Sequence, residues 1–387
     1  MKLSDDQKKS LKALMKWFKD KKSPQIITLG GYAGTGKTTL IGLLRKNLHD
    51  EKKDLEVLFC SYTGKATRVL KEKLVITKAV YDTDSVRTIH SLIYSPLLDD
   101  KERIIGWEKR DFVKGDLIIV DEASMVDETI WKDLISYEIP IIAVGDHGQL
   151  PPIKGKFNLM EEPDLRLEKI HRQAEENPII KISIVARNRG VIPRIPYGPK
   201  VKVLNRRDPE AQQEVGDLLE SYNDETLVIC GYNTTRIKLN RHIRSVLGFE
   251  SEDPQLGDTV ICLRNNHQEG IYNGMIGKIL SIKKESKNWL FADIQMSDDR
   301  IFSGPIYAPQ FNNPQSLNHT DNRAKTMQGE LFDFGYALTV HKSQGSQAKR
   351  VILFEERFKQ MTDDMWKKWL YTGVTRAQEE LYLVGGE

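Results

Sequence analysis

The sequence has few cysteines, no long apolar run and little net charge. Its three cysteines, Cys60, Cys230 and Cys262, lie far apart, and no pair has the spacing of zinc ligands. Such an odd, sparse set does not indicate a disulfide framework, so we expect buried, reduced thiols. No apolar run approaches the ~20 residues that a bilayer span needs, and the first residues contain no apolar signal core. We therefore expect a cytoplasmic protein that makes no membrane contact.

Charge and composition limit the class of partner and the number of domains. The formal net charge is only +3, so a nucleic-acid partner would require a local basic channel. The 39% hydrophobic and 29% charged residues are typical of a globular protein. A chain of 387 residues is long enough for two or three domains.

Short apolar runs recur in both halves of the chain, and continuous runs of this kind are typical of strands buried on both faces of a parallel sheet. They lie at residues 26–29, 57–59, 117–120 and 141–144, and again at 227–230, 337–340, 351–354 and 381–384. The pattern predicts two α/β units. Ser4 followed by Gln7 is a capping-box pattern, which predicts the start of a helix before the first run.

The pattern changes between about residues 257 and 334. Alternating stretches at 259–262, 278–282 and 289–294 are separated by Gly, Asn and Lys clusters. Alternation predicts half-buried strands, so we expect a small β-barrel inserted into the second α/β unit. Residues 308–330 are rich in Asn, Pro and Gln, which predicts a long loop.

A phosphate-binding loop is the first chemical signal. Residues 31–38 read Gly-Tyr-Ala-Gly-Thr-Gly-Lys-Thr, which fits the pattern G-x-x-x-x-G-K-[ST] between a predicted strand and a helical run. Glycines let the backbone N–H groups face phosphate oxygens, Lys37 reaches the outer phosphates, and the Thr38 hydroxyl ligates Mg²⁺. The residues expected to hold ATP here are Gly34, Thr35, Gly36, Lys37, Thr38 and Thr39.

An acidic pair supplies the second half of the expected nucleotide site. The run at 117–120 delivers Asp121 to the carboxyl end of a strand, where it can hold the hydration shell of Mg²⁺, and Glu122 can polarise the attacking water. An acidic pair after a strand is also a common helix cap. Its position downstream of a phosphate loop favours the catalytic interpretation. The two motifs together indicate an ATPase or GTPase.

Further segments narrow the class, because with the phosphate loop they resemble, in order, the motifs of superfamily 1 helicases. The resemblance is closest to the RecD- and Dda-like group that moves 5′→3′. Segments resembling motifs Ia, Ib, II, III, IV, V and VI lie at 62–66, 88–92, 121–124, 145–152, 170–173, 338–346 and 371–377. One departure is Gln347, which stands where the family often has a glutamate, and no nucleotide contact is expected of it.

The resemblance implies roles for individual residues. Gln149 would sense the γ-phosphate, Arg172 and Arg376 would neutralise charge in the transition state, and Gln7 would read adenine. Hydroxyl, imidazole and ammonium groups suit a grip on single-stranded DNA that does not depend on base sequence. The residues expected to bind DNA are Thr63, Lys65, His90, Pro152, Thr339, His341, Lys342 and Ser343.

The resemblance also implies the architecture: two RecA-like P-loop NTPase motor domains in an α/β fold, with two insertions. The first motor domain would comprise residues 1–90 and 116–165, interrupted by a β-hairpin, or pin, at 91–115. The second would comprise 166–255 and 335–387, interrupted by an SH3-like β-barrel at 256–334.

The expected activity is that of an ATP-dependent 5′→3′ DNA helicase that uses ATP and Mg²⁺ and acts on single strands and on junctions with duplex. An RNA helicase, or a translocase that strips bound proteins without unwinding, remains open, because 2′-OH contacts cannot be identified in a sequence. A phosphate-loop switch without motor activity would not explain the two arginines or motif V.

Overall fold

The computed structural model describes residues 3–98, 104–151, 157–170, 176–264, 266, 269–271, 273–317 and 328–385. The chain forms two compact units. The first comprises Met1–Ser95, Glu108–Arg189 and Lys367–Thr375, and the second comprises Pro96–Trp107, Gly190–Trp366 and Arg376–Glu387. The expected domain boundaries, with one insertion in each motor domain, stay a prediction.

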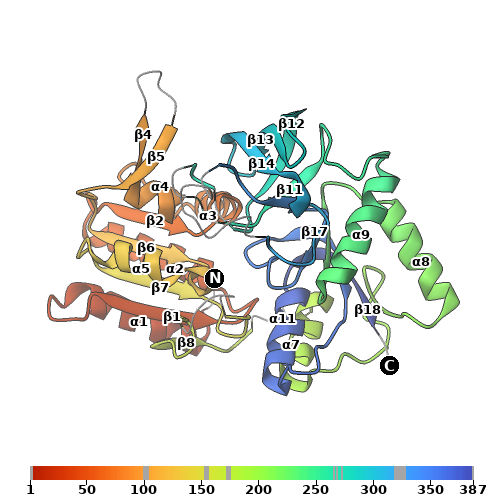
Figure 1. The fold of residues 1–387 in the computed structure, drawn as a ribbon. Coiled ribbons are helices and arrows are strands. Elements are labelled where there is room, and N and C mark those ends of the chain that lie inside the picture. Colours follow the sequence, from red (N-terminus) through yellow and green to blue (C-terminus); the bar gives the residue numbers. More distant parts are fainter. Residues whose placement is uncertain are drawn as a thin grey trace. The chain divides into compact units, whose positions relative to one another are not determined.

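A parallel sheet of six strands, in the order β3-β2-β6-β7-β1-β8, forms the centre of the first unit (Figure 1). The strands are β1 (Ile26–Gly31), β2 (Val57–Ser61), β3 (Ser85–Thr88), β6 (Leu117–Asp121), β7 (Ile141–Gly145) and β8 (Leu165–Leu167). All four apolar runs predicted in this half are therefore strands. Every residue of β2 and β7 is buried, as expected for strands covered on both faces.

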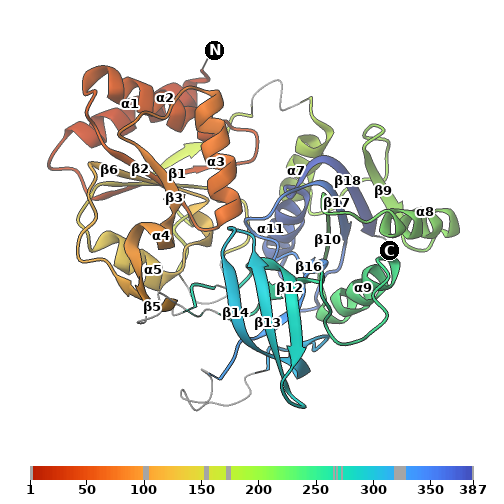
Figure 2. The ribbon, with the colours of Figure 1, turned by 90° about the horizontal axis from the view of Figure 1, so that it is seen from above.

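Helices cover both faces of this sheet, with α1 and α2 on one side and α4 and α5 on the other (Figure 2). The helices are α1 (Asp5–Lys19), α2 (Lys37–Glu51), α3 (Gly64–Ile76), α4 (Ile89–Ile93), α5 (Glu128–Ile135), α7 (Pro178–Arg189) and α11 (Asp363–Val374), whose residues from Lys367 onward belong to this unit. At the start of α1 the Gln7 side chain accepts a hydrogen bond from the Ser4 N–H at 3.1 Å. The predicted helix start is confirmed.

A separate two-stranded sheet pairs β4 (Tyr94–Leu98) with β5 (Ile104–Lys109). It lies in the segment 91–115, where the sequence predicts a hairpin, and the turn at 99–103 is outside the described residues. The role of this hairpin as a pin stays a prediction.

The second unit has a parallel sheet of five strands in the order β16-β10-β17-β18-β9. The strands are β9 (Val201–Asn205), β10 (Thr226–Cys230), β16 (Ala337–Thr339), β17 (Ala348–Phe354) and β18 (Ala377–Gly385), accompanied by the helices α8 (Pro209–Glu220) and α9 (Asn233–Val246). The four apolar runs predicted here are confirmed as strands. Leu239 and Ile243 of α9 share a hydrophobic core with Val228 and Ala337, so α9 covers β10 and β16.

An antiparallel sheet of five strands also belongs to the second unit, in the order β14-β13-β12-β11-β15 (Figure 2). The strands are β11 (Thr259–Cys262), β12 (Ile276–Lys284), β13 (Trp289–Met296), β14 (Ile301–Tyr307) and β15 (Phe332–Phe334). Alternate residues of β13 are buried in a separate hydrophobic core, as the alternating pattern predicts. That this sheet is an SH3-like barrel stays a prediction. Of the predicted loop at 308–330, residues 318–327 lie outside the described residues.

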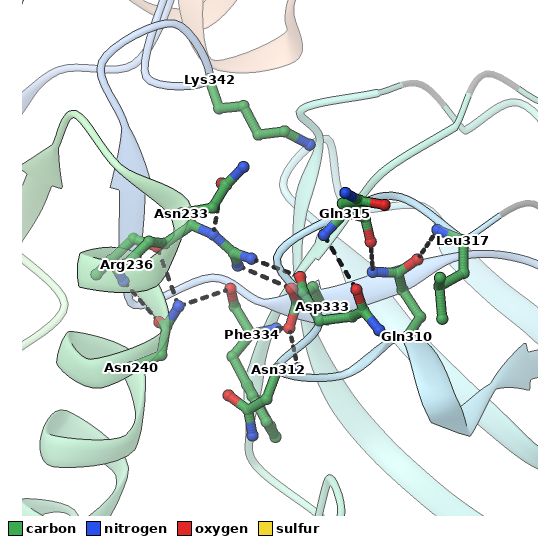
Figure 3. Close-up of polar contacts among 12 residues, drawn as sticks. Asn233, Arg236, Asn240, Gln310, Asn312, Gln315, Leu317, Asp333, Phe334 and Lys342 are labelled. Atoms are coloured by element: carbon green, nitrogen blue, oxygen red, sulfur yellow. Dashed lines mark hydrogen bonds and ion pairs between the residues drawn. The ribbon is translucent and has the colours of Figure 1, made fainter. Parts of the chain in front are cut away.

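The two sheets of the second unit are joined by a buried polar network centred on Asp333 (Figure 3). Arg236 of α9 donates to the Asp333 carboxylate at 2.8 Å, and that carboxylate also accepts from the backbone N–H groups of Asn312 and Phe334. The Asn240 amide accepts from the Ala337 N–H at 2.8 Å and donates to the Phe334 carbonyl at 3.3 Å. Polar side chains on one face of α9 therefore hold the chain in place where it passes from β15 to β16.

Two expected absences concern the thiols and the membrane. Cys60, Cys230 and Cys262 are all buried and unpaired, and burial raises the pKa of each thiol, so the expectation of buried thiols is confirmed. Among the helices of the described ranges, none combines the length and apolarity that a membrane crossing requires.

We expect Asp333→Asn to destabilise the second unit strongly. The Arg236 side chain is 7% exposed and cannot lose its proton, so the substitution leaves a buried charge without its counterion. Breaking such a pair costs about 3–5 kcal/mol. Glu225→Gln is the control, because the Lys349–Glu225 pair is more than half exposed and its loss should cost less than about 1 kcal/mol. Urea unfolding followed by circular dichroism measures both changes, and equal unfolding midpoints would contradict the prediction.

Candidate nucleotide-binding site

The phosphate loop joins β1 to α2 at the carboxyl edge of the first unit's sheet. Gly34 and Gly36 have φ angles of 80° and 77°, a left-handed conformation that glycine adopts at little cost. These two turns bring the chain directly into the first turn of α2, which begins at Lys37. The backbone N–H groups of that turn have no partner within the helix and carry the positive end of its dipole. Thr38 and Thr39 lie in the same turn and are half-buried.

The side chain of Lys37 folds back onto the phosphate loop. Its ammonium donates to the carbonyl oxygen of Gly31 at 2.5 Å and to that of Tyr32 at 3.1 Å. Two carbonyl oxygens thus take the place of water around the Lys37 ammonium. They hold this charge close to the backbone N–H groups of the loop. The sequence correctly places this charge at the loop.

The acidic pair stands at the end of β6, two strands from β1 in the same sheet, with β7 between them. Glu122 has a φ of 54°, a left-handed conformation that is unfavourable for a residue with a side chain. Such strain is concentrated at functional sites, where the surrounding fold enforces it. Burial raises the pKa of Asp121, the neighbouring Glu122 raises it further, and the Lys37 charge opposes both effects. Asp121 is thus a half-buried carboxylate that a nearby cation would stabilise.

The residues present fit a magnesium ion bound together with a nucleotide. The carboxylate of Asp121 accepts a hydrogen bond from the Glu122 N–H at 3.0 Å, and a hydroxyl is available on Thr38. Hard oxygen donors, few in number and completed by phosphate and water, are what Mg²⁺ prefers in phosphoryl-transfer sites. Within the described ranges no group of three His, Cys, Asp or Glu residues could hold a metal by itself.

The segment after β7 carries Gln149. Its side chain is 7% exposed, and its amide oxygen has no donor within hydrogen-bonding distance among the described residues. The turn that precedes it is fixed by Asp146, whose carboxylate accepts from the Gly148 N–H at 2.9 Å. A buried carboxamide with an unused acceptor is poised for a ligand, because leaving such an atom without a partner is costly.

Aromatic and cationic groups that the sequence analysis did not single out surround this segment. The guanidinium of Arg187 in α7 lies 3.5 Å from the centre of the Tyr32 ring, a cation–π contact. The His147 ring lies 4.2 Å from the same ring, and burial lowers the pKa of His147, which favours the neutral imidazole. Tyr371 of α11 is also in contact with the phosphate loop. Tyr32 occupies a variable position of the loop pattern, so the pattern gave no signal for it.

Gln7 is fully buried beside the phosphate loop. Its amide nitrogen donates to the Thr35 carbonyl at 3.0 Å, and its oxygen accepts from the Ser4 N–H. The structure therefore brings Gln7 to the nucleotide site, although its amide contacts protein groups. Adenine recognition by Gln7 stays a prediction.

Of the expected DNA-binding residues in the first unit, Thr63 and His90 are described. Thr63 caps α3, where its hydroxyl oxygen accepts from the Ala66 N–H at 3.2 Å. His90 lies in α4, is 6% exposed and packs against Tyr94 with 4.6 Å between ring centres. The side chain of Lys65, together with Pro152 and Arg172, lies outside the described residues.

In the second unit, the expected DNA-binding residues follow β16. The Lys342 ammonium donates to the Asn273 side chain at 3.3 Å. His341 is half-buried, which lowers its pKa. Ser343 is fully buried and donates to the Val340 carbonyl, while Thr339 accepts from the Lys342 N–H. The geometry thus favours a structural role for Ser343.

Arg376 is 2% exposed and donates to the Ser346 carbonyl at 3.3 Å, within the second unit. The Arg376 carbonyl also accepts a hydrogen bond from the Ala348 N–H. The contact joins the segments that resemble motifs V and VI. A role for Arg376 in catalysis stays a prediction.

Comparison with known families defines the class. Residues 2–191 match the AAA domain family, and residues 334–384 match the UvrD-like helicase C-terminal domain. Over 93% of its length the chain is 26% identical to the ATP-dependent RecD2 DNA helicase of Deinococcus radiodurans, of which it covers 47%. It is 22% identical to the ATP-dependent DNA helicase dda of Enterobacteria phage T4 over 99% of both chains. The chain thus spans about half the length of the RecD2 relative.

Solved structures agree in fold. A Pif1 helicase studied at forked double-stranded DNA has a TM-score of 0.51 and 19% identity, covering 99% of this chain and 92% of that one. A Bacteroides Pif1 helicase in complex with ADP-AlF3 and single-stranded DNA has a TM-score of 0.50 and 20% identity, covering 100% and 93%. Fold and family matches define a P-loop NTPase with a helicase C-terminal domain. Within that class the chain resembles superfamily 1 helicases of the RecD- and Dda-like group.

Proposed function

We propose that this chain is an ATP-dependent DNA helicase that moves 5′→3′ on single-stranded DNA and unwinds duplex. The observation that carries the proposal is the convergence of Lys37, Asp121 and Gln149 at one edge of one sheet. Similarity to the phage helicase over 99% of both chains supports extending this site to a complete motor. The 5′→3′ direction rests on the resemblance of the motifs.

The chemistry follows from the residues at the site. The N–H groups of the phosphate loop and the Lys37 ammonium bind the ATP phosphates. Thr38 and Asp121 would hold Mg²⁺, which would supply positive charge to the phosphates. Glu122 orients and polarises the attacking water. The Gln149 amide donates through its NH2 group to the γ-phosphate, and its unused oxygen accepts from the water. We propose that Arg172 and Arg376 act on the same nucleotide by neutralising charge that develops in the transition state.

Glu122→Gln should leave nucleotide binding intact and lower the turnover number of DNA-stimulated ATP hydrolysis by a factor of about 10²–10⁴, the range for loss of general-base catalysis. The amide is nearly isosteric and keeps the strained backbone, so the melting temperature should change little. Steady-state hydrolysis with single-stranded DNA and equilibrium binding of ADP measure the two effects.

Glu128→Gln is a suitable control, because Glu128 is an exposed residue of α5 that pairs with Lys132 of the same helix. A near-normal turnover number for Glu122→Gln would contradict the role of Glu122. Hydrolysis by the wild type that single-stranded DNA does not stimulate would favour a switch over a motor.

The grip on the strand is proposed for Thr63, Lys65, His90, Pro152, Thr339, His341 and Lys342, whereas the buried Ser343 supports the loop that carries two of them. Among them, Lys342 donates to the neutral side chain of Asn273 at 3.3 Å. An ammonium can exchange a contact with a neutral amide for a contact with a phosphate oxygen. Contacts of this kind release counterions when DNA binds.

Lys342→Ala should therefore flatten the salt dependence of binding to single-stranded DNA. The log–log slope should lose about 0.7, the value for one phosphate contact on a single strand. Lys238→Ala, on the exposed face of α9, is the control and should leave the slope unchanged. Fluorescence anisotropy over a salt series measures both, and equal slopes for wild type and Lys342→Ala would place Lys342 outside the strand path.

We propose that the β4–β5 hairpin is the wedge that separates duplex strands. Support comes from its base, which is anchored to α5 and the residues after it. The Tyr94 hydroxyl donates to the Asp133 carboxylate, and the Tyr137 hydroxyl contacts the backbone carbonyls of Ile93 and Arg110 at 3.1 and 2.7 Å. A wedge must resist the force of the motor, so a base held at both strands suits the role.

Replacing residues 95–106 by a short Gly-Ser turn should abolish unwinding of a 5′-tailed duplex. The hydrolysis rate and movement on single strands should be kept, because these require only the motor. Loss of the stacking surface at the junction is worth about 1–3 kcal/mol per base. A duplex with a 3′ tail serves as the polarity control in the wild type. Normal unwinding by the shortened protein would show that the wedge lies elsewhere.

A further inference from the structure

Tyr371 is a fully buried residue of α11 whose hydroxyl joins two parts of the nucleotide site. The hydroxyl oxygen accepts a hydrogen bond from the Ala33 N–H of the phosphate loop at 2.7 Å. The same hydroxyl donates to the Asp146 carboxylate at 2.6 Å. Burial, and then the Asp146 charge, raise the pKa of Tyr371 well above its usual value, so the phenol keeps the proton that it donates.

Asp146 passes this constraint to the segment that carries Gln149. One carboxylate oxygen of Asp146 accepts the hydrogen bond from the Tyr371 hydroxyl, and the other accepts from the Gly148 N–H at 2.9 Å. On the far side of Gln149, the Leu150 N–H donates to the hydroxyl of Thr372 at 2.9 Å. Two successive residues of α11 therefore hold the segment on both sides of Gln149.

The packing around Gly148 leaves no room for a side chain at this position. A Cβ atom at Gly148 would lie 2.8 Å from the Tyr32 ring and 3.0 Å from the Tyr371 ring. Tyr32 belongs to the phosphate loop, and its ring meets that of Tyr371 edge to face, with 6.0 Å between centres. The loop, the Gln149 segment and α11 thus form one packed polar and aromatic assembly.

We propose that Tyr371 is a positioning residue of the nucleotide site, which sets the distance between the phosphate loop and Gln149. The inference rests on the proposed ATP hydrolysis and deepens it. The Ala33 N–H and the Asp146 carboxylate both belong to the framework of the site, and the Tyr371 phenol contacts both. With the phenol in place, nucleotide that binds to the loop meets Gln149 at a fixed position.

The test compares two phenols with the same chemistry. Tyr336 is 2% exposed, accepts from the Thr259 N–H at 3.0 Å and donates to the Asp258 carboxylate at 2.7 Å, all within the second unit. Tyr336→Phe therefore removes the same pair of hydrogen bonds as Tyr371→Phe, at a place where no nucleotide residue is proposed. Both variants keep the ring and its packing.

We expect Tyr371→Phe to lower the turnover number for ATP about tenfold, as for the loss of one hydrogen bond to a charged group. The KM for ATP and the Kd for ADP should change less than threefold, because the loop N–H groups and Lys37 remain. Tyr336→Phe should show a similar fall in melting temperature with an unchanged turnover number. Equal turnover numbers for wild type and Tyr371→Phe would overturn the proposal.

Hydrogen exchange of the loop gives a second readout that does not require hydrolysis. The Ala33 amide should exchange at least about tenfold faster in Tyr371→Phe and at the wild-type rate in Tyr336→Phe, since a protected N–H loses its acceptor. Unchanged exchange at Ala33 would also overturn the proposal. If the wild type failed to hydrolyse ATP while Ala33 exchange still depended on Tyr371, the proposed function would fail and the positioning contact would stand.

Thr372→Val extends the test if Tyr371→Phe does not fold. It removes the acceptor of the Leu150 N–H with almost no change in side-chain volume. The turnover number should again fall more than the KM rises. A Thr372→Val variant with normal turnover would show that the Gln149 segment does not need α11.

Discussion

Parallel pairing of β1, β7 and β6 is the constraint on which the nucleotide site depends. Parallel strands end at the same edge of a sheet, so the phosphate loop after β1, the Asp146 turn after β7 and the acidic pair after β6 are brought together. Because β7 lies between the other two strands, the loop and Asp121 are separated by one strand. Ligands of open α/β sheets bind at such carboxyl edges. The unusual backbone conformations that the site requires are local. They are the left-handed φ angles of Glu122 and of the glycines in the phosphate loop.

Much of this arrangement follows from local sequence patterns, and some of it does not. The eight apolar runs were sufficient to predict eight strands, because burial on both faces requires continuous hydrophobicity. The strands β9 and β14 and the short strands β3, β8 and β15 were not predicted. Ser85–Thr88 is only partly buried, and three-residue strands give too few positions for any period to be visible.

The candidate site was predictable wherever its residues fall in a fixed spacing. Lys37, Thr38, Asp121 and Gln149 lie in such patterns. The Tyr371–Ala33 contact spans 338 positions of the chain, and Arg187 meets Tyr32 from a helix with no distinctive pattern. A pattern records neighbours along the chain, whereas these contacts depend on how the sheet and helices are packed. The fold also assigns Ser343 to a buried hydrogen bond, which its position in a motif could not reveal.

The same hydrogen-bonding unit occurs in both compact units with different consequences. In each, a buried phenol accepts from a backbone N–H and donates to a carboxylate: Tyr371 with Ala33 and Asp146, and Tyr336 with Thr259 and Asp258. Asp258 is itself bound by both side-chain nitrogens of Arg244 that face it, so its position is fixed by a second buried group. Asp146 instead accepts a hydrogen bond from Gly148, which lies in a loop. Ala33 belongs to the phosphate loop, where we propose that phosphate binds. A contact that only stabilises the second unit therefore acts, in the first, on the loop that nucleotide must occupy. The contact of Tyr371 with the phosphate loop must be strong enough to order the loop and weak enough to let the site respond to its ligand.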